Sequence, residues 1–417
     1  MPKLPLLPPL LFLCMSLPLI AQVVHIPDFN FKNALLNNLS INTNNDTEIQ
    51  LSEAQAYNGT IGVFNKEIHD IRGIEAFTAL IGLNCQQNEL TSIDLSRNTA
   101  LETLDCSFNQ LTSLDLSKNT ALSNINCSSN HLSVLNLNNI SGLTALSCFF
   151  NQLTTLDLSS NPLLQTVSCN ANQLNYLNIN GLTELYLLNC QSNQLPFLNL
   201  SNNSKLGQLR CAVNKLLSID ISNNPDLVDV DCSQNLLTDI IFDNPLLERL
   251  WCYSNQLSYL ELDELTALTN LWCSSNELIT LNVQNGINHN FSFFSCENNP
   301  FLKCIEVDDS IYSSTHWYYI DSTANFSLNC PDILVSEASF YQMKPYPNPS
   351  MQRVRIKTKG WKNLSIRLYS INGQLMHAQN ELNCPAIEID ISDYNSGVYI
   401  LRIIADKLEN CTKLIKH

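Results

Sequence analysis

Residues 101–121 read LETLDCSFNQLTSLDLSKNTA, and close variants of this stretch run before and after it. In most repeats a Cys recurs every 21 residues, and an Asn follows it by three residues and a Leu by five. A repeat this strict is typical of a solenoid, in which every turn packs only on its two neighbours. The repeated cysteines are Cys85, Cys106, Cys127, Cys148, Cys169, Cys190, Cys211, Cys232, Cys252, Cys273 and Cys296.

Each repeat contains two short segments in which apolar and polar residues alternate, as in residues 104–106 and 114–116. This alternation predicts two short strands per turn, with the Leu and Cys side chains inside and the polar residue outside. Asn109 and Asn119 lie where the chain must turn, and a buried Asn there can bond the main chain of its own and the next turn. We therefore expect a mainly β coil of short parallel strands with an asparagine ladder.

The pattern LxxLxCxxNxLxxLDLSxN, which covers residues 80–299, resembles the leucine-rich repeat in its 21-residue IRREKO variant. The resemblance implies a leucine-rich-repeat solenoid. Ordinary leucine-rich-repeat proteins curve because helices space one side of the coil more widely than strands space the other. Neither half of this repeat is long enough for a helix, so we expect an only slightly curved rod of about eleven turns, roughly 50 Å long at ~4.8 Å per turn.

The repeated cysteines are expected to be free thiols in the core. In register, equivalent Cα atoms lie ~4.8 Å apart, which is within disulfide range, but side chains of parallel neighbours point the same way. Cys is also a compact residue that is readily buried. A metal site would need CxxC pairs and His, which the repeats lack. Disulfides and metal or redox chemistry are therefore the less favoured alternatives.

The N-terminal part of the chain divides into two segments. Residues 1–21 combine an early Lys3 with a short apolar run broken by prolines, which is typical of a secretory signal peptide rather than a membrane span. Residues 22–79 are expected to form an N-terminal cap and a first degenerate turn. The apolar spacing predicts a helix over residues 28–39 with Asp28 as its N-cap.

Residues 42–53, NTNNDTEIQLSE, have the spacing of a calcium-binding loop. Thr47 stands where the sharp turn of such a loop prefers Gly, and two of the first three ligand positions are neutral Asn. The alternative is a turn that caps the solenoid without a metal, and no other cofactor is expected. The candidate calcium ligands are Asn42, Asn44, Asp46, Glu48 and Glu53.

Residues 300–335 leave the repeat pattern and contain Cys304 and Cys330. The exposed end of a solenoid needs a cap, and one disulfide between these two cysteines would hold this segment together. A cap held by packing alone is the alternative. Residues 336–344 are expected to be a linker.

Residues 345–417 contain several alternating segments separated by turn signals, which predicts a small antiparallel β-sandwich. They resemble the type A C-terminal sorting domain of type IX secretion substrates. The resemblance implies export across the outer membrane of a Gram-negative bacterium, usually with removal of this domain and attachment to surface glycolipid or release. An ordinary binding sandwich is the alternative. The matching residues are Pro347, Asn348, Pro349, Tyr369, Gly373, Gly397, Val398, Tyr399, Lys413, Leu414, Ile415 and Lys416, while Ser370 replaces the usual Asp.

Charge and motif content exclude several functions. The net charge at pH 7 is −16, and the acidic excess lies before residue 345, which argues against nucleic acid and anionic membranes as partners. The sequence lacks the HExxH, GxSxG, GxGxxG and Walker motifs. One outward position carries Asp in several turns, which would suit a glycosidase, but a solvated polar face is the favoured interpretation. These residues are Asp94, Asp115, Asp157 and Asp220.

The outward residue just before each repeated Cys changes character along the chain. It is mostly polar in the early turns and becomes Trp251 and Trp272 in two adjacent turns. Two stacked, exposed tryptophans beside Arg and Tyr have the composition of a binding hot spot. The alternative is an aromatic pair that stabilises the sheet or lies under the C-terminal cap. The candidate ligand-binding residues are Trp251, Trp272, Tyr253, Arg249, Arg210 and Asp231.

A second, weaker binding candidate is formed by Phe108, Phe149 and Phe150, whose alternative role is core packing at the turn. Together the patterns favour a secreted, surface-displayed leucine-rich-repeat protein that binds a protein or glycan, or mediates adhesion, without catalysis. The alternatives are a structural surface-layer spacer and an enzyme with an unrecognised site. Expected partners are a protein or glycan at the cell surface and the secretion machinery. The expected location is outside the cell or on the outer-membrane surface of a Gram-negative bacterium.

Overall fold

The computed structural model describes residues 22–330, 345, 350, 353–357, 364–381, 386–405 and 408–416. The expected signal peptide (residues 1–21), the expected linker (residues 336–344) and Pro347, Asn348 and Pro349 lie outside these residues.

A twelve-stranded parallel sheet runs along the solenoid, with one three-residue strand per turn. The register keeps equivalent residues of successive turns opposite each other, as Leu83 pairs with Leu104 and Leu104 with Ile125. From the second strand of this sheet onward, each strand ends one residue before a repeated Cys, as β3 (Thr103–Asp105) does before Cys106. In spatial order the strands are β1 (Thr60–Gly62), β2 (Gly82–Asn84), β3 (Thr103–Asp105), β4 (Asn124–Asn126), β5 (Ala145–Ser147), β7 (Thr166–Ser168), β9 (Leu187–Asn189), β10 (Gln208–Arg210), β12 (Asp229–Asp231), β14 (Arg249–Trp251), β16 (Asn270–Trp272) and β18 (Phe293–Ser295).

The second segment of each repeat pairs much less continuously than the first. It forms only short sheets of two or four strands, separated along the solenoid. These sheets are β6 (Thr155–Asp157) with β8 (Tyr176–Asn178), β11 (Ser218–Asp220) with β13 (Asp239–Ile241), and β15 (Tyr259–Glu261), β17 (Thr280–Asn282), β19 (Cys304–Glu306) and β20 (Asn325–Ser327).

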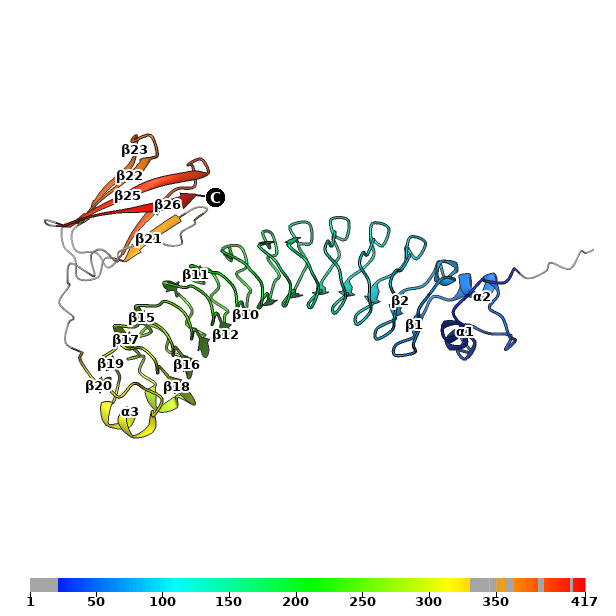
Figure 1. The fold of residues 1–417 in the computed structure, drawn as a ribbon, viewed down its shortest axis with the longest axis horizontal. Helices are drawn as coiled ribbons and strands as arrows, with labels where there is room; N and C mark the ends of the chain where they lie inside the picture. The colour runs from blue at the N-terminus through cyan, green and yellow to red at the C-terminus, as the bar shows by residue number, and fades with distance from the viewer. Residues whose placement is uncertain are drawn as a thin grey trace, which may run out of the picture.

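The solenoid forms a pronounced arc, with the twelve-stranded sheet on its inner, concave side (Figure 1). The expectation of an only slightly curved rod is therefore wrong. Strands in a continuous hydrogen-bonded ladder are held ~4.8 Å apart. The opposite side has that ladder only in short pieces, so its turns spread more widely even though no repeat contains a helix. We call the face of the twelve-stranded sheet the concave face.

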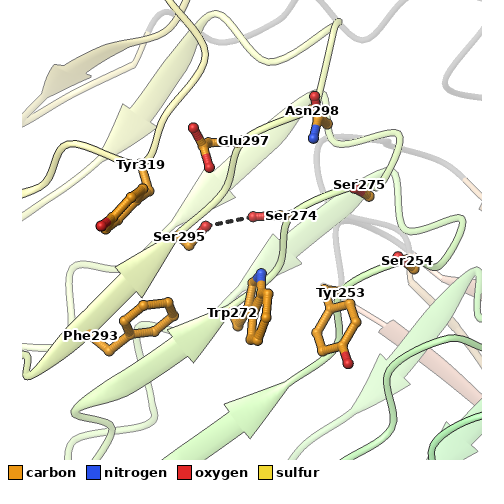
Figure 2. Close-up of a pocket in the computed structure, with 10 residues that line it drawn as sticks. All are labelled: Tyr253, Ser254, Trp272, Ser274, Ser275, Phe293, Ser295, Glu297, Asn298 and Tyr319. Atoms are coloured by element: carbon orange, nitrogen blue, oxygen red, sulfur yellow. Dashed lines mark hydrogen bonds between the residues drawn. The ribbon is translucent and has the colours of Figure 1, made fainter.

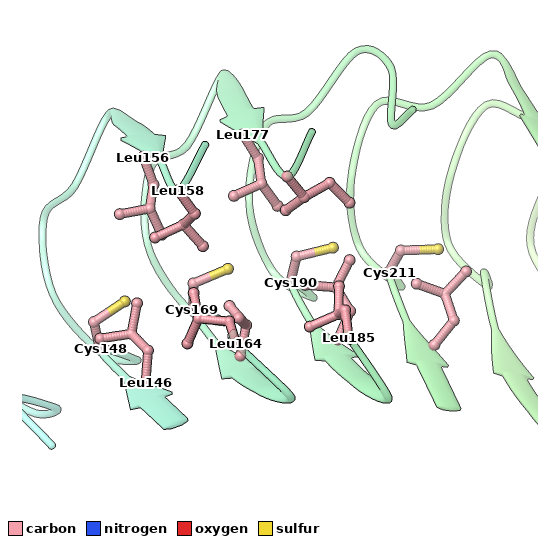
Figure 3. Packing of buried hydrophobic residues seen from close by; sticks show 14 of the residues in the cluster. Leu146, Cys148, Leu156, Leu158, Leu164, Cys169, Leu177, Leu185, Cys190 and Cys211 are labelled. Atoms are coloured by element: carbon pink, nitrogen blue, oxygen red, sulfur yellow. The ribbon is translucent and has the colours of Figure 1, made fainter. Parts of the chain in front are cut away.

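Leucine and cysteine side chains fill the interior, and the same pattern repeats in every turn. Figure 3 shows Cys148, Cys169, Cys190 and Cys211 in one row, with their sulfur atoms pointing the same way. All eleven repeated cysteines are buried free thiols, which confirms the prediction of a thiol-lined core. Leucines from both segments of each repeat surround this row.

The asparagine three residues after each Cys links consecutive turns through its side chain. The Asn109 Oδ1 atom accepts the backbone N–H of Leu90 at 3.0 Å. Its Nδ2 group donates to the carbonyl oxygens of Cys85 at 3.0 Å and Cys106 at 3.1 Å. The bridge therefore joins each turn to the preceding one, rather than to the next one as expected.

The residue just before this asparagine has a left-handed backbone in every turn from Gln87 to Asn298, with φ of 54° at Phe108 and 56° at Val213. For residues other than Gly this conformation costs about 1 kcal/mol or more, and a β-branched residue such as Val rarely adopts it. The tight turn that it makes brings the asparagine side chain inward, where its hydrogen bonds offset the cost.

A second asparagine ladder lies at the other turn of the coil. The Asn119 Nδ2 group donates to the carbonyl oxygens of Leu95 at 3.0 Å and Asn98 at 2.9 Å. Its Oδ1 atom is buried and has no hydrogen-bond partner among the described residues. This ladder therefore uses only half of the hydrogen-bonding capacity of its amide groups, and the first ladder makes the stronger link between turns.

The N-terminal cap contains α1 (Phe29–Leu36), α2 (Leu51–Ala56) and the 3-10 helix η1 (Ile74–Ala76). The Asp28 side chain caps α1 by accepting the backbone N–H of Phe31, as predicted. The helix ends at Leu36 rather than at residue 39, and Leu39 is exposed. Val63 is buried where later turns have Cys.

The C-terminal end of the solenoid is covered by η2 (Asn288–Asn290), α3 (Ser310–His316) and the segment after it. The predicted disulfide between Cys304 and Cys330 is present and encloses α3. Trp317 is buried and stacks on Phe294 of the last sheet strand at a ring-centroid distance of 4.1 Å. The cap therefore joins the solenoid through both aromatic packing and a covalent bond.

The C-terminal domain consists of two antiparallel sheets with a hydrophobic core of their own. One sheet pairs β21 (Arg353–Lys357) with β24 (Ala386–Asp390). The other has the order β23 (Leu375–Glu381), β22 (Leu364–Ser370), β25 (Gly397–Ala405) and β26 (Leu408–Lys416). The predicted antiparallel strands are thus confirmed.

The buried thiols predict that the solenoid loses stability at high pH. Burial raises the pKa of Cys127 and of Cys169 to about 12, whereas an exposed thiol has a pKa of about 8.5. The folded state therefore holds protons that the unfolded chain releases. The resulting stability is complete below pH 8.5 and is lost as pH rises toward 12, by up to about 1.4 kcal/mol per thiol and pH unit. Urea unfolding at pH 8 and pH 10 measures this loss.

A Cys127→Ala/Cys169→Ala variant is the control, because tyrosines and lysines also titrate in this range. Whatever its stability at pH 8, its free energy of unfolding should fall less steeply with pH than that of the wild type. Equal slopes for the two proteins would show that the thiols are not responsible.

Candidate binding surface

The concave face presents two outward residues from each three-residue strand, and the middle residue points into the core. In β14, Arg249 and Trp251 face outward and Leu250 is buried. The residue just after each Cys adds a third row, which includes Tyr253, Ser274 and Glu297. Function on this face therefore depends on which side chains occupy three rows of otherwise equivalent positions.

Aromatic rings occupy adjacent positions at the C-terminal end of this face (Figure 2). Tyr253 stacks on Trp272 with ring centroids 4.2 Å apart and an interplanar angle of 29°. Trp272 meets Phe293 edge to face at 5.9 Å, and Phe293 lies 6.2 Å from Tyr319 of the cap. The rings thus continue from the repeats into the C-terminal cap.

The two tryptophans are register partners in β14 and β16, but Trp272 stacks on Tyr253 rather than on Trp251. The expected stacked tryptophan pair is therefore replaced by a tyrosine–tryptophan stack. Trp251 remains 38% exposed and lies beside the cluster. A side chain from the row after the Cys thus packs on one from the row before the Cys of the next turn. The sequence pattern did not show this contact.

A pocket of about 400 Å³ opens among these rings. Its base includes the Ser274 and Ser295 hydroxyls, which share a hydrogen bond of 2.6 Å. Figure 2 shows this serine pair between the ring of Trp272 and the carboxylate of Glu297. The residues that line the pocket are Tyr253, Ser254, Trp272, Ser274, Ser275, Phe293, Ser295, Glu297, Asn298 and Tyr319.

The charged candidates lie on the concave face outside the pocket, and both arginines approach the same carboxylate, Asp229. The largely buried carboxylate of Asp229 lies 3.3 Å from the guanidinium of Arg249 and 3.9 Å from that of Arg210. Asp231 accepts a hydrogen bond from the hydroxyl of Ser233 at 2.6 Å. Arg210, Asp231 and Arg249 therefore belong to the same face but do not line the pocket.

Several pocket residues were absent from the sequence-based candidate set. Phe293 precedes Cys296 in the last turn, which the chain reaches after a step of 23 residues instead of 21. Tyr319 belongs to the cap and has no equivalent in the repeats. Glu297 occupies the row after the Cys, which gives small or polar residues in most turns. Indexing that row as well as the row before the Cys would have added Glu297 to Tyr253, which was already a candidate.

The second candidate, Phe108, Phe149 and Phe150, lies in other turns than the pocket. Phe108 and Phe150 have left-handed backbones and are 50% and 60% exposed, so they are not core residues. Phe149 and Phe150 contact each other edge to face at 5.8 Å. Phe149 and Phe150 thus form a small aromatic pair, and Phe108 lies two turns before it.

In this structure the carboxylates of the candidate calcium loop accept hydrogen bonds from protein donors, while the Asn42 Oδ1 atom is buried and has no partner among the described residues. The Asp46 carboxylate accepts the backbone N–H of Glu48 and side-chain amide protons of Asn44 and Gln50. Within the described residues no group of three or more His, Cys, Asp or Glu side chains is arranged to hold a metal. The loop is a hydrogen-bonded connection between α1 and α2, and its calcium site stays a prediction.

The other candidate ligands of this loop, Glu53, Glu48 and Asn42, also bond other groups of the protein. The Glu53 carboxylate accepts the N–H groups of Thr43 and Gln50. Glu48 pairs with Lys32 at 2.7 Å. The Asn42 amide donates to the carbonyl oxygens of Leu36 and Asp46. These bonds tie the ends of the cap together.

The row of outward aspartates does not have the properties of a glycosidase acid. The backbone N–H of Ser96 lowers the pKa of Asp94, and those of Ser117 and Ser159 lower the pKa of Asp115 and Asp157 in the same way. A general acid needs a raised pKa to stay protonated near neutrality. These carboxylates instead fix local turns.

The described sorting-motif residues lie in the second sheet of the C-terminal domain. Gly373 has a φ of 82° in the turn between β22 and β23, where its N–H donates to Ser370. The Tyr399 hydroxyl donates to the carbonyl of Asn395 at 2.7 Å. Gly397 pairs with Lys416 where β25 meets β26, and Lys413 lies in β26 opposite Ile400.

Residues 344–417 match the family described as the secretion system C-terminal sorting domain. The C-terminal domain is a sorting domain. This match confirms the resemblance to substrates of type IX secretion and supports export of the protein. No helix among the described residues is long and apolar enough to cross a bilayer.

Solved structures show that the solenoid has the leucine-rich-repeat fold. The functional domain of InlJ from Listeria monocytogenes, whose structure is described as including a cysteine ladder, is 23% identical, with a TM-score of 0.63. The similarity covers 95% of this chain and 99% of that one. The internalin InlF of the same species is 20% identical over 76% of this chain and 100% of its own, with a TM-score of 0.55. None of the curated proteins compared with the chain matches it.

The disulfide predicts a specific loss of stability at the pocket end of the solenoid. A Cys304→Ser/Cys330→Ser variant opens a loop with a sequence separation of 26, which should cost about 3 kcal/mol of cap stability. The cap should then unfold at lower urea concentration than the remaining repeats, as followed by the fluorescence of buried Trp317. Wild-type protein treated with dithiothreitol should behave like the variant. An unchanged urea profile would mean that packing alone holds the cap.

Proposed function

We propose that the protein is a secreted, surface-displayed binding protein whose concave face engages a ligand at its C-terminal end, without a catalytic step. The observation that supports this proposal is the pocket of about 400 Å³ lined by Tyr253, Trp272, Phe293 and Tyr319. Aromatic residues are enriched at the centres of binding interfaces, and a concave pocket with a few polar groups is typical of a ligand site. The sorting domain supports delivery of this face to the outside of the cell.

The exposure of the aromatic cluster favours binding over a purely structural role. Phe293 is 36% exposed and Tyr319 is 55% exposed, although aromatic residues that only supported the sheet or the cap would be buried. Phe294, next to Phe293, shows the structural alternative, since it is buried against Trp317. Phe294 therefore packs against the cap, whereas Phe293 stays accessible to a ligand.

The alternative of a spacer makes a different prediction about this surface. A spacer needs only the length and stiffness of the solenoid, which the core and the asparagine ladder already provide. It gives no reason for four aromatic side chains to surround an open pocket. An enzyme is the least favoured alternative, because hydrogen bonds from serines lower the pKa of Asp94, Asp115 and Asp157, whereas a general acid needs a raised pKa.

A comparison of two double variants tests the binding role. The chain without residues 1–21 is immobilised, and the proteins and glycans that it retains from host-surface and bacterial-surface extracts are quantified. Trp251→Ala/Trp272→Ala should reduce retention of at least one specific partner by about a hundredfold or more, because two hot-spot residues contribute about 2 kcal/mol each.

The matched control is Phe108→Ala/Phe150→Ala, which removes two exposed aromatic rings that do not line the pocket. It should retain that partner at the wild-type level. Circular dichroism and urea unfolding establish that both variants are folded. If both variants retain the same partners as the wild type, the binding proposal fails and the spacer is favoured.

A further inference from the structure

The pocket carries negative charge that no cation among the described residues neutralises. The exposed carboxylate of Glu297 at its rim has no hydrogen-bond or ion-pair partner among the described residues. Among the described residues that line the pocket, none is Lys, Arg or His. A second carboxylate, Asp321, lies next to the rim and accepts the backbone N–H groups of Asn298 and Asn299 at 2.9 and 2.6 Å.

The aromatic rings add to this negative potential. An aromatic ring carries partial negative charge on its face, which attracts cations within about 6 Å of its centroid. Phe293 and Tyr319 lie 6.2 Å apart with an interplanar angle of 33°, so their faces are inclined at a modest angle. The planar guanidinium of arginine stacks on such faces better than a lysine ammonium does.

The serine pair supplies hydrogen-bond acceptors at the base of the pocket. The Ser274 and Ser295 hydroxyls are buried and bonded to each other, so one of them donates and each keeps at least one lone pair. A guanidinium has five N–H donors and no acceptor. It can therefore donate to this base and to Glu297 at the same time.

A sugar ring stacked on Trp272 fits this arrangement less well. Stacking of a sugar needs a free aromatic face, but Tyr253 covers one face of Trp272 at 4.2 Å and Phe293 meets the same ring edge to face. An anionic group would be repelled by Glu297 and Asp321. The combination of unpaired carboxylate, ring faces and hydroxyl acceptors selects a cation.

We infer that this pocket receives an arginine side chain of a partner protein, with the guanidinium against Phe293 and Tyr319 and paired with Glu297. The inference rests on the binding role proposed above and gives the chemistry of its ligand. A basic partner also suits the acidic chain, whose net charge is −16. Arginine is enriched among interface hot spots, so one inserted side chain would anchor a larger contact along the concave face.

The test uses the chain without residues 1–21 and a probe that contains only the proposed group. N-acetyl-L-arginine amide is titrated into protein with ¹⁵N-labelled tryptophan, and the indole N–H shift of Trp272 is followed by NMR. N-acetyl-L-citrulline amide is the neutral analogue of the same shape. The arginine probe should bind at least about tenfold more tightly than the citrulline probe, because cation–π and ionic contacts are both lost in citrulline.

Two conservative variants assign the contact to the pocket. Glu297→Gln should weaken arginine binding about three- to fivefold, and high salt should abolish this difference. Glu277→Gln removes an exposed carboxylate that does not line the pocket and should bind the probe as the wild type does. Tyr319→Leu tests the aromatic wall at an exposed position and should also weaken binding.

Equal affinity for the arginine and citrulline probes, or wild-type affinity in Glu297→Gln, would overturn the inference. That result, together with loss of partner retention in the tryptophan double variant, would leave the binding role intact and refute only the arginine ligand. Probe binding without any partner that depends on Trp251 and Trp272 would refute the proposed function instead.

Discussion

The structure depends on one side-chain amide that is repeated in every turn. Each asparagine of the first ladder satisfies a backbone N–H and two carbonyl groups at the tight bend that follows each strand. Buried polar groups without partners cost about 1–3 kcal/mol each. The amide therefore holds consecutive turns in register and allows the left-handed residue that precedes it. The row of cysteines fits beside this bridge because the thiol is small, apolar and neutral when buried.

The regularity of the core leaves the concave face free to vary. Because each turn contacts only its neighbours, a change in an outward side chain alters one position on the surface and little else. The early turns carry mostly Asn, Asp and Ser in the row before the Cys, whereas the last turns carry the aromatic cluster and the cap closes it with Tyr319. Specialisation of this surface is therefore concentrated where the repeat pattern itself begins to break down.

The features that follow from spacing alone were predictable from the sequence. The inward Leu and Cys rows, the asparagine ladder, the Cys304–Cys330 disulfide and the sorting domain are all confirmed. Curvature was not predictable in this way, because it depends on how continuously the second strand pairs. The pocket was missed for a related reason, since Phe293 follows an irregular step and Tyr319 lies outside the repeats. The calcium loop stays a prediction, since its ligand spacing is present while its carboxylates accept hydrogen bonds from protein donors.

Amide hydrogen exchange in an Asn130→Ala variant tests the central role of the asparagine bridge most directly. Asn130 accepts the N–H of Leu111 at 2.9 Å and donates to Cys106 and Cys127. Its loss should accelerate exchange at Leu111 about a hundredfold, since about 3 kcal/mol of local stability is removed. The equivalent amide of Leu195, which Asn214 accepts, should exchange as in the wild type. Unchanged protection at Leu111 would show that the strands alone hold the turns together and would contradict this account.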